Sequence, residues 1–397
     1  MERNMTVSDV QQTRIIAPAG KIDILLVLAL IMIAAGIGGG IYAQVVGHHH
    51  AFANTREMPW GMLIGVYAYF AIISTGLCLM AAISHVFHVQ RLLPLANRMV
   101  WLSIIVLLGA FTVIGLEIEN PWRMPLGMVL HANITSNIWW MGTLYGLAVG
   151  LLMLEFSLIW SGRLKAALVL GMAGAVAEML ANTNLGSVFA SLSARPFWYG
   201  SQLPIFFLAS AVLSGAAAVV FFTHYAHVLE RREMSDGTFQ GLRMAGKIMS
   251  IMLFLISLAT AWKYVNAYCG TEELQLAADA TVRGPLATNF WLFEVGIGLV
   301  LPFLLLTVTR MRSRQALSLA ALMVLVGQFF SRYNLVVAGV IVPQYAGYTD
   351  MPIYQSYAPT VAEYLLVVGG LGVIALGFWA GEKSFGKLFH ADQRQEE

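Results

Sequence analysis

Charged side chains are scarce in this sequence. Asp, Glu, Lys and Arg together make up only 11% of its 397 residues, whereas 58% are hydrophobic. A soluble globular domain carries about 25% charged residues, so the composition excludes that class and predicts a protein embedded in lipid. The net charge of +2 carries no information about partners, because in a membrane protein the distribution of charge matters more than its sum. Nothing in the composition indicates nucleic acid as a partner.

Cysteine is almost absent. Only Cys78 and Cys269 occur, whereas an iron–sulfur cluster is usually held by four cysteine thiolates. We therefore expect no cluster in this chain, and any cluster with which it exchanges electrons must belong to a partner. We also expect neither a disulfide nor a metal site.

Long apolar runs are abundant. A transmembrane helix needs about 20 apolar residues, and ten runs meet this requirement. The first 21 residues are too polar for a signal peptide, so we expect a tail over 1–21, one transmembrane domain over 22–380 and a second tail over 381–397. The expected spans are Ile22–Val46, Trp60–Phe87, Arg98–Ile118, Ile138–Trp160, Leu164–Asn182, Trp198–Leu229, Gly246–Tyr268, Leu286–Thr309, Gln315–Val340 and Thr360–Ala380.

The basic residues predict how these spans are oriented. When alternate loops are assigned to opposite sides, with the N-terminus inside, 17 of the 23 Lys and Arg residues fall inside. Cytoplasmic loops of membrane proteins carry such an excess. We therefore expect an all-α protein of about ten spans in the cytoplasmic membrane of a bacterium or archaeon, with both termini in the cytoplasm.

Ionisable residues in or beside the spans gather in the predicted outer half of the membrane. Snorkelling to the headgroups would explain any one of them. Six helices each contribute one, however, and intramembrane charges usually face a bundle interior and pair, which favours a shared polar pocket. The six residues are Glu117, Glu178, Lys263, Glu294, Arg332 and Glu363. Glu155, near the inner end of the fourth span, is the exception.

Neutral polar side chains occur at the same predicted level. They include His131, Asn133, Asn182, Asn184 and Tyr333. Such groups can form hydrogen bonds with the two carbonyl oxygens of a quinone, and a neighbouring carboxylate or His can exchange the protons that its two-electron chemistry requires.

Two His-x-x-His pairs lie at the predicted inner face, His85 with His88 and His224 with His227. One His from each helix could ligate a haem, which would make the chain a b-type cytochrome. A proton path with Glu155 and ordinary interfacial histidines are the alternatives. A transporter or channel without a redox role is a further class, although transporter sites usually lie near the membrane midplane.

Short polar and aromatic segments punctuate the spans. They are Pro59-Trp60-Gly61, His131-Ala132-Asn133-Ile134-Thr135-Ser136, Leu154-Glu155-Phe156, Leu185-Gly186-Ser187, Pro196-Phe197-Trp198, Phe290-Trp291 with Glu294 and Pro302, Arg332-Tyr333, and Tyr357-Ala358-Pro359-Thr360-Val361-Ala362-Glu363. Their order and their positions on the spans resemble the polysulfide reductase membrane-subunit family, the NrfD/PsrC-like proteins, and especially its ten-span branch with HybB-type and DsrP-type subunits.

The resemblance implies two four-helix bundles with peripheral helices, and no cofactor beyond a bound quinone, either menaquinone or ubiquinone. It also implies a ferredoxin-like iron–sulfur subunit on the outer, periplasmic face, with further catalytic or cytochrome subunits beside it. The chain departs from the HybB-type branch before Leu185-Gly186-Ser187, where a His-Gln pair is missing. It departs again at Trp140, Met141 and Gly142, where that branch has a Glu.

These observations together predict a quinone-handling membrane subunit of a redox complex, which exchanges electrons with its partner on the outer face and has a possible role in proton translocation. The expected groups for proton exchange are Glu117, Glu178, Glu294 and His131. The expected quinone-binding groups are Asn133, Asn182, Asn184, Arg332 and Tyr333. Glu363 is expected to hold the last helix in place.

Overall fold

The computed structural model describes residues 20–343 and 352–390, and these contain helices and no strands. Ten helical segments are long and apolar enough to cross a membrane, which confirms the predicted number of spans. They are α1 (Gly20–Val46), α3 (Met62–Val86), α4 (Leu93–Glu117), α6 (Asn137–Trp160), α7 (Leu164–Ala190), α8 (Gln202–Glu230), α9 (Asp236–Tyr268), η1 with α11 (Asn289–Val300 and Leu301–Val308), α12 (Arg314–Ile341) and α13 (Val361–Phe389).

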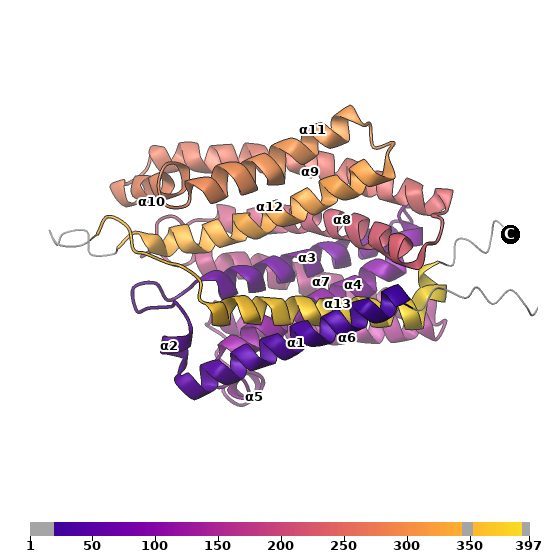
Figure 1. Ribbon diagram of the computed structural model, residues 1–397, viewed down its shortest axis with the longest axis horizontal. Coiled ribbons are helices and arrows are strands. Elements are labelled where there is room, and N and C mark those ends of the chain that lie inside the picture. The colour runs from indigo at the N-terminus through magenta and orange to yellow at the C-terminus, as the bar shows by residue number, and fades with distance from the viewer. Residues whose placement is uncertain (1–19, 344–351, 391–397) are drawn as a thin grey trace, which may run out of the picture.

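The spans lie along the long axis of the molecule (Figure 1). Three short helices, α2 (His48–Ala51), α5 (Arg123–Leu130) and α10 (Glu272–Val282), lie at one end, which we call the α10 end. The start of α1 and the end of α13 lie at the other end, which we call the His390 end. The Lys and Arg distribution predicts that the α10 end is the outer face and the His390 end is the cytoplasmic face.

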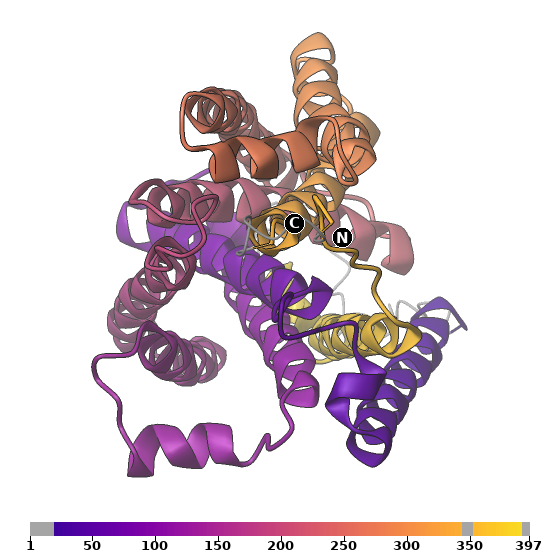
Figure 2. The same cartoon turned by 90° about the vertical axis from the view of Figure 1, so that its left-hand side faces the viewer.

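The spans form two groups of four helices. Helices α3, α4, α6 and α7 pack in one group, and α8, α9, η1 with α11, and α12 pack in the other. The view along the helices shows α1 and α13 side by side at the edge of the molecule, where α13 packs on α4 (Figure 2). This is the arrangement that the family resemblance implied.

Small residues bring the two groups into close contact. A Cβ atom on Gly76 of α3 or on Gly215 of α8 would overlap the backbone of the other helix. Gly36 of α1 and Gly369 of α13 face each other in the same way. Glycines at such crossings let helix backbones approach closely, which is how membrane helices gain packing without a hydrophobic driving force.

Several helices extend beyond the expected spans, three of them by eight residues or more, because helices continue past the hydrocarbon core. Helix α9 begins at Asp236, where Ser235 provides an N-cap, and α13 continues to Phe389, into the stretch expected as a tail. Helix α7 continues to Ala190 through a polar stretch that the sequence suggested was a loop. The Thr183 hydroxyl donates to the Met179 carbonyl oxygen (2.7 Å) and that of Ser187 to the Thr183 carbonyl oxygen (3.1 Å), so these side chains are satisfied inside the helix.

The eighth span has an unusual backbone. Residues Asn289–Val300 form a π-helix, and the chain then continues as the α-helix α11, with Pro302 in its first turn. A Cβ on Gly298 of this segment would overlap Gly327 of α12. π-Helical turns are rare and are frequently found at functional sites, and Glu294 lies in this one.

Candidate functional site

Glu178 is fully buried (0% exposed) between α7 and α3. Thr75 Oγ1 donates to its Oε2 at 2.6 Å, and Ser74 Oγ lies 2.9 Å from its Oε1. No cation among the described residues forms an ion pair with it. Neutral hydroxyl groups therefore hold this carboxyl group, and they can accommodate either its charged or its protonated form.

Unpartnered polar groups surround Glu178. Asn182, one turn further along α7, is buried and neither of its amide atoms has a hydrogen-bond partner within the described structure. The buried hydroxyl groups of Tyr67 and Tyr145 also have none, and both are close enough to interact with the charge of Glu178. Buried polar groups are nearly always satisfied, so this cluster has hydrogen-bonding capacity for water or a ligand.

The position of Glu178 along its helix is less extreme than the sequence suggested. We expected it late in the fifth span, because that span was expected to end at Asn182. Since α7 continues to Ala190, Glu178 lies near the middle of the helix, and its place in the outer half of the membrane stays a prediction.

Glu294 forms a second buried cluster, with α12. Asn334 Nδ2 donates to Glu294 Oε2 at 2.7 Å, and the Asn334 carbonyl Oδ1 has no partner in the described structure. Arg332 is also buried (1% exposed), and none of its three guanidinium nitrogens has a hydrogen-bond partner among the described residues. Its guanidinium lies over the rings of Phe206 and Phe207, 5.1 and 4.6 Å from their centroids.

Lys263 of α9 adds a second positive charge beside Glu294. Its Nζ lies 3.8 Å from the centroid of the Phe197 ring, and among the described residues it forms no ion pair. Both Lys263 and Arg332 interact with the charge of Glu294. Two basic side chains thus lie within electrostatic reach of one carboxyl group.

A cavity of about 670 Å³ lies beside Lys263, between the first turns of α8 and the last turns of α9. Aromatic side chains, including Trp198, Phe206 and Trp262, line it. A much smaller void of about 10 Å³ touches Phe206 and Lys263 on one side and Glu294, Ser331 and Asn334 on the other. The void therefore lies between the cavity and the Glu294 cluster.

A row of polar side chains leads from Glu178 toward the His390 end. Cys78, one turn after Ser74 on α3, is buried and interacts with the charges of both Glu178 and Glu155. Glu155 of α6 is 3% exposed, and its Oε1 lies 3.9 Å from His85 Nδ1 at the end of α3. One face of α3 therefore connects the two carboxylates with the end of the helix.

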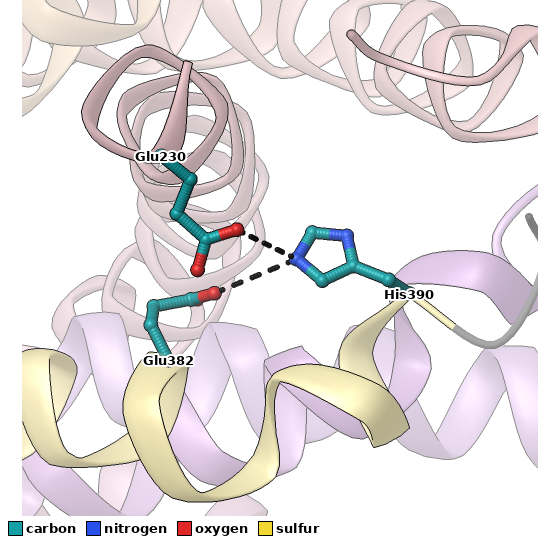
Figure 3. Close-up of side chains that lie close together, drawn as sticks. All are labelled: Glu230, Glu382 and His390. Atoms are coloured by element: carbon teal, nitrogen blue, oxygen red, sulfur yellow. Dashed lines mark ion pairs between the residues drawn. The ribbon is translucent and has the colours of Figure 1, made fainter. Parts of the chain in front are cut away.

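At the His390 end, Glu230, Glu382 and His390 converge from α8, α13 and the residue that follows α13 (Figure 3). His390 Nε2 lies 3.6 Å from Glu230 Oε2 and 3.8 Å from Glu382 Oε2. Two carboxylates and an imidazole are possible ligands for a divalent metal ion. Arg98, however, donates from Nη2 to Glu382 Oε2 at 2.9 Å and is itself 2% exposed. The guanidinium therefore supplies the positive charge, and we interpret the cluster as an ionic contact between three helices.

The remaining predicted residues lie apart from these clusters. His131 and Asn133 are exposed between α5 and α6, where Asn133 Oδ1 accepts from the Thr135 hydroxyl at 2.7 Å. Asn184 Nδ2 donates to the Asn137 carbonyl oxygen at 2.6 Å and joins α7 to α6. Tyr333 is half-buried, with its ring 6.4 Å from that of Tyr357. The structure thus distributes the predicted set over several places and does not gather it into one pocket.

Glu117 and Glu363 lie near the α10 end. Asn54 Nδ2 approaches Glu117 Oε1 at 3.4 Å. Glu363 forms a capping box with Thr360 at the start of α13 and accepts from the Tyr357 hydroxyl at 2.9 Å. Burial and the neighbouring Glu363 charge raise the pKa of Tyr357, so its hydroxyl remains a donor. Glu363 thus has the structural role expected of it.

Sequence reasoning missed Ser74, Thr75, Tyr67 and Tyr145. Their signal was weak, because hydroxyl groups are common in membrane helices and bond to their own backbone, as Thr75 Oγ1 also does with the Ala71 carbonyl oxygen at 3.1 Å. The adjacent Ser74 and Thr75 in the second span, on the face that also carries Cys78 and His85, were the only indication.

Comparison with known proteins gives a consistent result. A family model described as polysulphide reductase, NrfD, matches residues 51–344, more than half of the chain. A selenate reductase subunit of Mesobacillus selenatarsenatis is 22% identical over 82% of this chain and 85% of its own. The Hdr-like menaquinol oxidoreductase integral membrane subunit of Archaeoglobus fulgidus is 21% identical over 90% and 92%. A putative dimethyl sulfoxide reductase membrane subunit of Halobacterium salinarum is 24% identical over 89% of each chain.

Proposed function

This chain belongs to the polysulphide reductase NrfD family, and from that premise we propose that it exchanges electrons between the membrane quinone pool and a partner subunit. It is a multi-pass protein of the cytoplasmic membrane, and its relatives are named as subunits of oxidoreductases, one of them a menaquinol oxidoreductase. The proposed partner is a ferredoxin-like iron–sulfur subunit at the α10 end, the predicted outer face. Catalytic or cytochrome subunits would complete the complex.

The observation that carries this proposal is the pair of buried carboxylates, each of which accepts a hydrogen bond from a neutral side chain. Oxidation of a quinol releases two protons together with two electrons, so a quinone site needs groups that exchange protons away from bulk water. Glu178, held by Thr75 and Ser74, and Glu294, held by Asn334, are such groups. Glu117 and His131 lie outside these clusters, and we assign them no role in proton exchange.

The α3 row supports a second element of the proposal, which is proton transfer toward the His390 end. From Ser74 to His85 the row spans about 16 Å along the helix axis, at 1.5 Å per residue. Cys78 and Glu155 lie along this stretch. We propose that protons pass between Glu178 and the predicted cytoplasmic face through this row, with water completing the hydrogen bonds.

The first test is the Glu178→Gln variant of the assembled complex in its native membrane. Glutamine keeps the shape and the hydrogen bonds to α3 but cannot exchange a proton. We expect quinol-linked electron transfer to fall at least about tenfold, since a positioned acid–base group typically contributes 10²–10⁴-fold, while the amount of assembled complex remains unchanged. Glu119→Gln, which alters an exposed carboxylate between α4 and α5, is the control. Undiminished turnover in Glu178→Gln would remove Glu178 from the mechanism.

A further inference from the structure

The cavity between α8 and α9 has the shape and lining of a site for an amphipathic molecule. It extends from Gln202 and Asn266, at the α10 end, to Ala209 and Leu255 deeper along the two helices. Ile205, Leu255 and Trp262 at its rim are 73%, 44% and 59% exposed, on a surface that the ten spans place in lipid. A molecule dissolved in the bilayer can therefore enter it sideways.

One charged group lines this cavity, among the residues that the structure describes. Lys263 lies about 7 Å inside the end of α9, counted as five residues before Tyr268 at 1.5 Å per residue. Phospholipid phosphates lie at the headgroup level, above this depth. Lys263 forms no ion pair within the described structure, and such a donor at the end of an apolar cavity suits the carbonyl oxygen of a neutral ring.

The polar groups behind Lys263 lack partners. Asn334 Oδ1 and all three nitrogens of Arg332 are buried and unsatisfied within the described structure. The void that joins Lys263 to Asn334 and Glu294 has a volume of about 10 Å³, which is close to the minimum for a single water molecule. One water there would touch both Lys263 and Glu294 and would connect the cavity with the carboxylate.

We infer that the cavity between α8 and α9 is the quinone site of this protein, with the ring beside Lys263 and the isoprenoid chain along the apolar walls toward Leu255. This inference rests on the proposed function. Two basic side chains, Lys263 and Arg332, near this end of the cavity favour a ring that gains electron density when it is reduced or deprotonated.

The chemistry balances with the groups present and the proposed partner. When a quinol is oxidised, its two O–H bonds break and two carbonyl groups form. Each proton passes in turn through a water molecule in the void to the Glu294 carboxylate, and it is then released along the Glu178 route of the proposed function. The two electrons go one after the other to the iron–sulfur centre of the proposed partner, which passes each on to the catalytic or cytochrome subunits of the complex. In the reverse direction the same groups return the protons to the ring.

The test uses membranes that contain the whole complex. Ala259→Phe fills the cavity, and Lys263→Met removes the ammonium group. The matched control is Ala380→Phe, which places the same side chain in an apolar hollow between α4, α6 and α13. A photoreactive azido-quinone should label α8 or α9 in the parent and control proteins. We expect Ala259→Phe to abolish this labelling and to raise the KM for quinol roughly tenfold, since it removes binding. Lys263→Met should lower kcat as well, and the pH profile of quinol oxidation should shift.

The outcomes separate this inference from the proposed function. If the label and the quinol kinetics are unchanged in both cavity variants, while Glu178→Gln is impaired, the ring binds elsewhere and the inference is wrong. If the parent complex binds no quinone at all, the proposed function fails first. A phospholipid that co-purifies with the parent and is lost in Ala259→Phe, without any change in quinol kinetics, would assign the cavity to lipid and overturn the inference.

Discussion

Two buried carboxylates of this protein are stabilised in opposite ways. Glu178 is held by the hydroxyl groups of Thr75 and Ser74, whereas Glu382 is paired with the Arg98 guanidinium. Hydroxyl donors tolerate a neutral carboxamide in place of the carboxylate, but a buried guanidinium does not, because its charge is then uncompensated. The same Glu→Gln change should therefore affect activity at the first site and stability at the second.

We predict that Glu382→Gln destabilises the protein by about 3–5 kcal/mol, the usual cost of leaving one partner of a buried ion pair alone. Thermal unfolding of the purified protein in detergent measures this. The exposed Lys387→Gln variant of the same helix should unfold within a few degrees of the parent. Since removing both charges costs less than removing one, Arg98→Gln with Glu382→Gln should be more stable than Glu382→Gln alone. If Glu382→Gln alone were as stable as the parent, the ion-pair interpretation would be wrong.

The sequence revealed which residues are unusual but not which groups contact them. Glu178 and Glu294 stood out because a charge in an apolar run is costly. Thr75, which holds Glu178, is 103 residues away in the chain, and Asn334, which holds Glu294, is 40 residues away. Contacts of this kind depend on how the helices are rotated against each other, and periodicity in a uniformly apolar span does not report that rotation.

At the scale of single helices, the existence of the spans was predictable and their ends were not. Length and hydropathy determine whether a segment crosses the bilayer. They do not report that α7 continues to Ala190, because its polar side chains bond to the helix's own carbonyl oxygens. The π-helical backbone of Asn289–Val300 has no composition signal either, since its residues would suit an ordinary helix.

The crossing of α3 and α8 gives a prediction about packing. Gly215→Leu should prevent the two four-helix groups from closing, because any side chain there overlaps the backbone at Gly76. Overpacking of a close contact costs typically 1–3 kcal/mol and sometimes more, so we expect a lower yield of folded protein by size-exclusion chromatography in detergent. Gly146→Leu, where a Cβ would meet no atom within 4 Å, is the control. Equal yields for both variants would show that this crossing tolerates a side chain.

For the whole molecule, the sequence predicted ten spans and the resemblance implied two four-helix groups, and both are confirmed. The orientation in the membrane stays a prediction, based on the unequal distribution of Lys and Arg. The structure supplies a natural reporter for it, since Cys269 is exposed at the α10 end and Cys78 is buried.

We therefore predict that a membrane-impermeant thiol reagent labels Cys269 in intact cells whose outer barrier is permeable to the reagent. Cys269→Ser should lose the label. A cysteine placed at Ser161, exposed after α6 at the His390 end, should react in the Cys269→Ser background only once the cytoplasmic membrane is opened. Labelling of the Ser161→Cys protein without such opening would reverse the assigned orientation.

The ionic contact at the His390 end also has a consequence for biosynthesis. Arg98 lies in α4 and Glu382 in α13, 284 residues later in the chain. During synthesis Arg98 is therefore without this counter-charge until α13 has been made. A chain in which α13 is missing keeps a guanidinium without its Glu382 partner, and leaving one partner of a buried ion pair alone is strongly destabilising.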